Sequence, residues 1–240
     1  MHAAADVALM FDTDGTLVDA RRAVVDAVAE GLAETYRHFY LPVPRPDPER
    51  IALAMGLPSS AFFRVAFDPA TVPQEQRDAF SCEFEVRSVR AEVAALDRGD
   101  TDLYPGVEET LETLAERGHR LFLFSNATSP YFEAVVRAHR LDRFFTRMLS
   151  LEAAVRWRLA RDKEGMIRHL SHGFGSAVVI GDRVHDVQAG HAAGARTVGC
   201  RYGFGEDGEL DTADWIIETT PELIELPFTA RTARPGTGTG

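Results

Sequence analysis

The sequence predicts an α/β fold in which a parallel β-sheet is covered by helices on both faces and is interrupted by an all-helical insertion. Short apolar runs recur along the 240 residues with helix-like stretches between them. That alternation is typical of strands that are buried on both faces of a parallel sheet. Between about residues 21 and 102 the alternation gives way to helical patterns alone. The chain is long enough to bury such a core.

The expected strands are short runs of apolar residues that end at turn signals. They lie at residues 7–11, 121–124, 145–149, 177–180, 197–200 and 215–217. The first run ends in two aspartates, Asp12 and Asp14, followed by Gly15 and Thr16. Two carboxylates so close together repel each other unless a cation or a shared proton lies between them. This placement is costly for structure alone and indicates a chemical role.

Helical periodicity predicts three helices that accompany the strands. Residues 107–117 carry Val107, Leu111 and Leu114 at helical spacing, and the pattern stops at Gly118, a residue common at helix C-termini. Two further helices are expected at 130–140 and 187–195. Inside the insertion, helices are expected at residues 22–36, 48–55, 60–67 and 74–96. The core therefore resumes near residue 101, after a helical segment of residues 21–100.

The composition of the chain narrows the classes of molecule that we expect it to bind. The formal net charge of -11 argues against nucleic acid or an anionic membrane as the main partner. No apolar run reaches the roughly 18 residues of a membrane span, and the N-terminus lacks the pattern of a signal peptide. The two cysteines, Cys82 and Cys200, fit reduced thiols. We therefore expect a cytoplasmic protein with a small-molecule partner, whose oligomeric state stays unknown.

Acidic residues follow two of the expected strands. Asp12 and Asp14 end the first, and Asp182 ends the fourth, with Asp186 four residues later. Because the carboxyl ends of parallel strands form the ligand crevice of an open sheet, we expect these side chains to converge there. Oxygen-rich sites of this kind suit Mg²⁺, a hard cation. A bound divalent metal is also the simplest way for so acidic a protein to hold an anionic substrate.

Other polar residues are expected at the same edge. Gly15 allows the backbone to turn its N–H groups towards an anion. Ser125 and Asn126 end the second strand, and Lys163 could add positive charge. Each has a simpler explanation when taken alone. Ser125 and Asn126 are typical of a helix N-cap, as is Asp182, and Lys163 of an exposed surface.

Taken in order, these residues resemble the four motifs of the haloacid dehalogenase-like (HAD) superfamily. Residues 11–19, Phe-Asp-Thr-Asp-Gly-Thr-Leu-Val-Asp, resemble the first motif, and Leu-Phe-Ser-Asn at 123–126 the second. Lys163 resembles the third, and Gly-Asp-Arg-Val-His-Asp at 181–186 the fourth. The insertion after the first motif is similar to the small cap of the phosphoglycolate phosphatase-like branch. The resemblance implies a Rossmann-like catalytic core of residues 1–20 and 101–228 and a helical cap of residues 21–100. The tail, residues 229–240, is expected to be disordered because it is rich in Gly, Thr, Arg and Pro.

The resemblance also implies a reaction. It is the Mg²⁺-dependent hydrolysis of a small phosphate monoester through an aspartyl-phosphate intermediate. Asp12 would attack phosphorus, and Asp14 would protonate the leaving oxygen and then activate water. Ser125 and the backbone N–H of Asn126 would hold phosphoryl oxygens, and Lys163 would neutralise charge on Asp12 and the phosphate.

A metal site and a substrate loop are implied in the same way. Mg²⁺ would bind Asp12, the backbone carbonyl of Asp14 and Asp182, with Asp186 as a direct or water-mediated ligand. Cations are needed because an anionic nucleophile must approach an anionic phosphate. The substrate-binding residues implied by the resemblance are Gly15, Thr16 and Asn126.

Several alternatives stay open at this point. The substrate could be phosphoglycolate, a sugar phosphate or a nucleoside monophosphate. A phosphomutase of the β-phosphoglucomutase type would use the same nucleophile but return the phosphoryl group to a sugar. A non-catalytic binding protein on the same fold is a third possibility, against which the intact set of Asp12, Asp14 and Asp182 argues. Arg161 competes with Lys163 for the role of the third motif.

Overall fold

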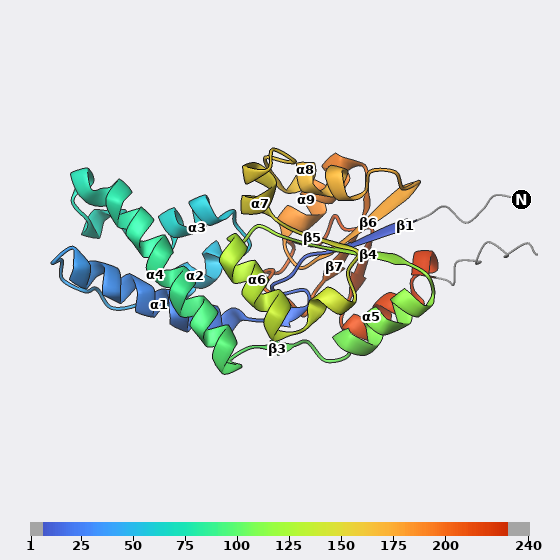
Figure 1. The fold of residues 1–240 in the computed structure, drawn as a ribbon, viewed down its shortest axis with the longest axis horizontal. Coiled ribbons are helices and arrows are strands. Elements are labelled where there is room, and N and C mark those ends of the chain that lie inside the picture. Colours follow the sequence, from blue (N-terminus) through green and yellow to red (C-terminus); the bar gives the residue numbers. More distant parts are fainter. Residues whose placement is uncertain (1–6, 230–240) are drawn as a thin grey trace, which may run out of the picture.

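The computed structural model describes residues 7–229, in which parallel strands form one six-stranded sheet with helices on both faces (Figure 1). The strand order is β5-β4-β1-β6-β7-β8. These strands are β1 (Val7–Phe11), β4 (Arg120–Ser125), β5 (Arg147–Ser150), β6 (Ser176–Gly181), β7 (Arg196–Cys200) and β8 (Trp215–Ile217). The chain moves outward from β1 in one direction and then in the other, which makes β1 the topological switch point at which open parallel sheets bind ligands. The predicted α/β class is confirmed.

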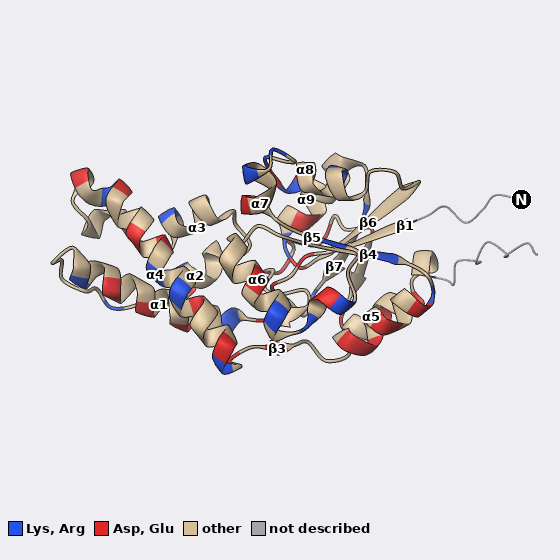
Figure 2. Ribbon diagram, viewed as in Figure 1, with Lys and Arg blue, Asp and Glu red and all other residues tan. Residues whose placement is uncertain are grey.

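The two faces of the sheet carry separate apolar layers, because successive side chains of a strand point to opposite faces. Leu9 and Phe11 of β1 pack towards α5 and α6, whereas Ala8 and Met10 pack towards α7, α8 and α9. Figure 1 shows these two helical layers below and above the sheet. The helices are α5 (Val107–Glu116), α6 (Ser129–Ala138), α7 (Leu151–Arg156), α8 (Lys163–Leu170) and α9 (Val184–Ala193). The exposed side of α5 is acidic (Figure 2).

A helical segment lies beyond the carboxyl ends of the strands (Figure 1). It comprises α1 (Arg21–His38), α2 (Pro48–Ala54), α3 (Ser59–Val65) and α4 (Arg77–Arg98). Helices α1 and α4 approach closely at Gly31, where an added Cβ would lie 2.6 Å from the hydroxyl oxygen of Ser88. The two chain connections to the core, β2 (Val18–Asp19) and β3 (Asp102–Leu103), pair as an antiparallel ribbon.

Several elements differ from the sequence-based expectation. The short strands β2 and β3 and the helices α7 and α8 were not expected. Helix α9 begins at Val184 rather than at residue 187, because the carboxylate of Asp186 accepts the backbone N–H of Arg183 at its start. The helix expected at 74–96 divides into a 3₁₀ turn and α4. The 3₁₀ helices are Pro69–Thr71, Gln74–Gln76, Leu141–Arg143, Thr220–Glu225 and Pro227–Thr229.

The expected disordered tail, residues 229–240, lies outside the described residues except for Thr229. That residue is fully buried, and its backbone carbonyl accepts a hydrogen bond from Arg117, so it belongs to the folded core. Within residues 7–229, none of the helices combines the length and apolar character that crossing a membrane requires.

Candidate active site

The carboxyl ends of β1 and β6 bring together acidic side chains that are 170 or more residues apart in the sequence. Asp12 directly follows β1, and its backbone N–H donates a 2.9 Å hydrogen bond to the carbonyl of Ile180 on β6. Asp182 follows β6, and Asp186 lies in the first turn of α9. Carboxylate oxygens of Asp12, Asp182 and Asp186 all lie within 4.8 Å of one another, and all three residues are buried. The expected convergence at this edge is therefore present.

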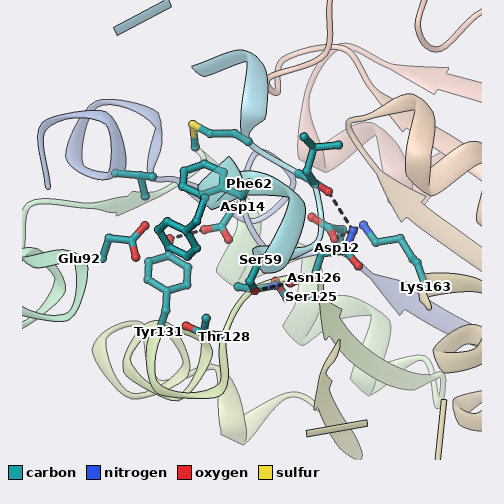
Figure 3. A pocket seen from close by; sticks show the side chains of 16 residues that line it. Asp12, Asp14, Ser59, Phe62, Glu92, Ser125, Asn126, Thr128, Tyr131 and Lys163 are labelled. Carbon is teal, nitrogen blue, oxygen red and sulfur yellow. Dashed lines mark hydrogen bonds and ion pairs between the residues drawn. The ribbon is translucent and has the colours of Figure 1, made fainter. Parts of the chain in front are cut away.

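Lys163 stands between two of these carboxylates. Its ammonium donates hydrogen bonds of 2.8 Å to Asp12 and 2.7 Å to Asp186 (Figure 3 shows Lys163 beside Asp12). Lys163 is placed there by the start of α8, where the side chain of Asp162 caps the helix by accepting the N–H of Gly165. Burial lowers the pKa of Lys163, but the two carboxylates outweigh burial and raise that pKa above its usual range.

Arg161, the alternative for the third motif, lies elsewhere. It is exposed, and it forms no hydrogen bond or ion pair with the part of the chain that the structure describes. The structure thus places Lys163, and not Arg161, beside the carboxylate of Asp12.

Asp182 is held in place by the loop after β1. Its carboxylate accepts a 3.0 Å hydrogen bond from the hydroxyl of Thr16 and a 2.7 Å hydrogen bond from the backbone N–H of Phe204. Gly15 has a φ of +81°, and an added Cβ there would lie 2.1 Å from a carboxylate oxygen of Asp182. Only glycine lets the loop approach that carboxylate so closely.

Gly15 and Thr16 make contacts here that differ from those expected at a substrate, although their substrate-binding role stays a prediction. The backbone N–H of Gly15 donates to the carbonyl of Val18 and is not presented to an anion. Thr16 is fully buried, and its hydroxyl is directed at Asp182. Both residues therefore position a carboxylate, and neither lines the cavity described below.

The charges in this cluster do not balance. Burial, partly offset by Lys163 and reinforced by Asp186 and Asp182, raises the pKa of Asp12 well above its usual value. Burial and the neighbouring carboxylate of Asp186 raise the pKa of Asp182 to about 7. Three buried carboxylates share a single ammonium, so a divalent cation would stabilise their ionised forms. The all-oxygen donor set fits Mg²⁺.

Asp14 occupies a different position from the three clustered carboxylates. Its side chain accepts a 2.7 Å hydrogen bond from the hydroxyl of Tyr131, which lies on α6 (Figure 3). Burial raises the pKa of Asp14 to about 6, although the hydrogen bond from Tyr131 and the charge of Lys163 lower it. The expected metal contact of Asp14 involves its backbone carbonyl, and that contact stays a prediction.

A cavity opens beside Asp12 and Asp14, between the core and the helical segment (Figure 3). Ser125 and Asn126 line it, as the sequence suggested, together with Thr128 and Tyr131 from the start of α6. The hydroxyl oxygen of Ser125 accepts the backbone N–H of Ala127 at 3.1 Å. The helical segment contributes apolar and aromatic side chains and one acid.

Asn126 links the core to the helical segment. Its side-chain amide donates a 2.9 Å hydrogen bond to the carbonyl of Gly56, and its own carbonyl accepts a 3.2 Å hydrogen bond from the hydroxyl of Ser59. Arg183 makes a second link, because its guanidinium donates to the carbonyl of Met55 while it pairs with Glu209. These contacts close the cavity from the side of α2 and α3.

Among the cavity residues that sequence reasoning missed are two with ionisable side chains, Tyr131 and Glu92. Tyr131 was part of an expected helix but carried no signal that its hydroxyl would reach Asp14. Glu92 lies on α4 among several other acids, and it differs from them in being 8% exposed. Burial and the charge of Asp14 raise the pKa of Glu92 to about 8. The spacing carried a signal for this burial, because Glu92 lies eight residues after Phe84 and four before Leu96, on the buried face of α4.

Comparison with known proteins gives the family. The model of the family described as haloacid dehalogenase-like hydrolase matches residues 9–200. The chain belongs to this family. This HAD-like hydrolase is 29% identical over 228 residues to a phosphoglycolate phosphatase of Haemophilus influenzae, covering 90% of the chain and 96% of the relative. It is also 29% identical over 208 residues to a 5'-nucleotidase of Pseudomonas aeruginosa, covering 84% of the chain and 86% of the relative.

Solved structures show the same fold. The HAD-like hydrolase superposes with a TM-score of 0.68 on a haloacid dehalogenase-like hydrolase from Streptococcus pneumoniae, at 20% identity and with 91% of this chain and 96% of that chain covered. The TM-score is 0.67 for CbbY from Rhodobacter sphaeroides in complex with phosphate. The two chains are 20% identical, and the match covers 91% of this chain and 96% of that chain. The protein is therefore an enzyme, a hydrolase, whose curated relatives named here are phosphatases.

Proposed function

We propose that this HAD-like hydrolase is a phosphatase that hydrolyses a small phosphate monoester through a phosphorylated Asp12. One observation carries the proposal: the carboxylate of Asp12 borders a cavity while an ammonium, that of Lys163, lies 2.8 Å away. An anionic nucleophile needs such a cation in order to approach an anionic phosphoryl group. The names of the phosphoglycolate phosphatase and 5'-nucleotidase relatives support the same class of reaction.

The proposed reaction has two steps. In the first, a carboxylate oxygen of Asp12 attacks phosphorus, the bond from phosphorus to the leaving oxygen breaks, and Asp14 gives its proton to that oxygen. In the second, Asp14 takes a proton from water, and the water oxygen attacks phosphorus and releases inorganic phosphate and Asp12. A carboxyl group whose pKa is about 6 can hold and release a proton near neutral pH, which suits Asp14 to both steps.

Positive charge and hydrogen bonds hold the phosphoryl group. Ser125 borders the cavity, and its hydroxyl would donate to a phosphoryl oxygen. Lys163 favours the ionised form of Asp12, against the effect of burial, and offsets charge beside it. Asp12, Asp182 and Asp186 would hold Mg²⁺, with the carbonyl of Asp14. Bound Mg²⁺ supplies further positive charge against the phosphoryl oxygens.

The helical segment acts in this proposal as a cap over the cavity. Its contacts with the core at Asn126 and Arg183 would close the site against bulk solvent while leaving room for the one water molecule that attacks phosphorus. The ribbon of β2 and β3 is the place where the cap joins the core, so opening for substrate and product would bend the chain there. A cytoplasmic location stays a prediction from the sequence.

Replacing the nucleophile tests the proposal. Asp12→Asn keeps the shape of the side chain and removes its charge, so we expect phosphate release from p-nitrophenyl phosphate in Mg²⁺ to fall to background. Asp47→Asn is the matched control, because Asp47 is an exposed N-cap residue of α2 and asparagine caps equally well. Retained activity in a folded Asp12→Asn protein would remove Asp12 as nucleophile. Recovery of an isomeric sugar phosphate in place of free phosphate would favour the mutase alternative.

A further inference from the structure

The charges that line the cavity differ from those that a carboxylate-bearing substrate requires. Lys163 is the only lysine, arginine or histidine among the described residues lining it, and its ammonium is already shared by Asp12 and Asp186. Figure 3 shows Glu92 at one end of the cavity, Lys163 at the other, and Asp14 between them. The end away from Lys163 therefore holds an acidic side chain and no counter-ion.

Polar atoms without partners border the same space. The hydroxyl oxygen of Thr128 and the side-chain oxygen of Asn126 are buried and have no hydrogen-bond partner among the described residues. Glu92 is also buried, and within residues 7–229 its carboxyl group forms no hydrogen bond or ion pair. Buried polar groups are nearly always hydrogen-bonded in native proteins. Two such oxygens, together with the carboxyl group of Glu92 that lines the same cavity without a partner among the described residues, indicate a ligand that carries hydrogen-bonding groups.

The remaining walls are apolar. Phe62 and Phe63 of α3 and Leu57 before it face the cavity from the cap, and the ring of Tyr131 faces it from the core. Figure 3 shows Phe62 close to Tyr131 and Asp14. Apolar walls with a few polar groups are typical of sites that bind the carbon skeleton of a small molecule and orient its hydroxyls.

We propose that this site selects phosphate monoesters whose leaving group is uncharged and carries hydroxyls, and that it discriminates against leaving groups that carry a carboxylate. The proposal rests on the phosphatase activity proposed above, because it concerns the alcohol which that reaction releases. Hydroxyls can both donate to and accept from the groups of Glu92, Asn126 and Thr128. A carboxylate at the same place would be buried beside Glu92 and Asp14 with no cation to pair with it, which is strongly unfavourable.

A matched pair of substrates isolates the charge of the leaving group. Glycerol 3-phosphate and 3-phosphoglycerate share a three-carbon skeleton and differ in that a CH₂OH group of the first is a carboxylate in the second. With Mg²⁺ present, we expect kcat/KM to be about tenfold or more higher for glycerol 3-phosphate. p-Nitrophenyl phosphate serves as the reference for hydrolysis itself.

A variant that adds a cation tests the residue assignment. Glu92→Lys places a cation at the acidic end of the cavity, so the ratio of kcat/KM for glycerol 3-phosphate to that for 3-phosphoglycerate should fall at least about fivefold. Glu85→Lys is the matched control on the same helix, because Glu85 does not line the cavity. The ratio for Glu85→Lys should stay within about twofold of wild type. An unchanged ratio in a folded Glu92→Lys protein would overturn the role of Glu92.

The wild-type ratio decides the main inference even where Glu92→Lys does not fold. A ratio near one, a preference for 3-phosphoglycerate, or no turnover of either ester while p-nitrophenyl phosphate is hydrolysed overturns the inference and leaves the phosphatase activity standing. If none of the three esters releases phosphate, the proposed function itself fails, and the inference fails with it.

Discussion

The ammonium of Lys163 lies 2.8 Å from the carboxylate of Asp12, across 151 residues of sequence. The side chains of both residues are at most 10% exposed. Burying an ion pair removes the hydration of both charges, which is unfavourable. The attraction between the two charges compensates for that loss only when their geometry is good. The pair therefore adds little to stability over a well-packed apolar pair, whereas the ammonium favours the ionised form of a carboxylate that borders the cavity. The ion pair therefore matters more for the proposed reaction than for stability, and several of the expected outcomes depend on it.

Removing the ammonium should harm both activity and stability. We expect Lys163→Met to lower kcat/KM for p-nitrophenyl phosphate at least about 100-fold, because the charge on Asp12 and the phosphoryl group is no longer offset. Breaking a buried pair by removing one partner costs about 3–5 kcal/mol. Phosphate release and urea unfolding of the metal-free protein measure the two effects.

Arg161→Met is the control for that variant, since Arg161 is exposed and two residues away from Lys163. Its activity should stay within about twofold of wild type, and its free energy of unfolding within about 0.5 kcal/mol. The opposite result, with activity lost at Arg161 and kept at Lys163, would assign the third motif to Arg161.

Metal affinity should depend on Thr16 although its side chain is not expected to touch the ion. Thr16→Val removes the 3.0 Å hydrogen bond that orients the carboxylate of Asp182. Losing such an outer partner typically weakens metal affinity about 10- to 100-fold. A titration of activity against Mg²⁺ should show half-maximal activity at a correspondingly higher concentration.

Thr13→Val is the matched control for Thr16→Val. The hydroxyl of Thr13 is equally buried but donates to the carbonyl of Phe124, away from the acidic cluster. Both variants lose one buried hydrogen bond and should lose similar stability, about 1 kcal/mol. Only Thr16→Val should change the Mg²⁺ titration. Equal titration curves for the two variants would show that Thr16 does not support the metal site.

The sequence predicted the sheet and the meeting of Asp12 with Asp182 because both follow from local patterns. An apolar run marks a strand, and the polar residue after it marks the strand's carboxyl end. The direction of a side chain beyond that end depends on packing between distant elements. Thr16 was therefore expected at the substrate, whereas it bonds to Asp182, and the contact of Tyr131 with Asp14 was not foreseen. Helix α8 was missed because Gly165 and polar residues interrupt its short apolar pattern.

The stability of the metal-free protein should fall as pH rises from about 5 to about 8. Asp182 has a pKa of about 7 in the fold and that of Asp12 is also raised, so the folded state binds more protons than the unfolded state in this window. The stabilisation associated with each proton is present below the unfolded pKa near 4. It is lost as pH rises through the folded pKa, at up to about 1.4 kcal/mol per pH unit.

Mg²⁺ should reverse that trend, because it binds the ionised carboxylates. Thermal unfolding at pH 5, 6, 7 and 8, with EDTA or with Mg²⁺, measures the effect, and the rise in Tm caused by Mg²⁺ should grow with pH. Asp182→Asn should flatten both trends. A rise in Tm that does not vary with pH would contradict the assignment of these carboxylates as ligands.

The acidic limb of the pH–rate profile should report Asp14, which must lose a proton before it can activate water. The hydroxyl of Tyr131 donates to the carboxylate of Asp14 at 2.7 Å and lowers its pKa, which burial holds at about 6. Tyr131→Phe removes a hydrogen bond that contributes about 1 kcal/mol. The pKa of Asp14 should therefore rise, and the acidic limb of kcat should move up by about 0.7 pH units.

Tyr36→Phe is the control for the Tyr131→Phe profile, because it makes the same chemical change inside the cap, where the hydroxyl of Tyr36 bonds to that of Thr71. Its pH profile should overlay that of the wild type even if its stability falls. A shift of the Tyr131→Phe limb to lower pH would mean that the hydroxyl stabilises the protonated form of Asp14. An unmoved limb would mean that another group controls it. The unmoved limb would separate Asp14 from the water-activating step, because Tyr131→Phe removes a hydrogen bond made to the carboxylate of Asp14.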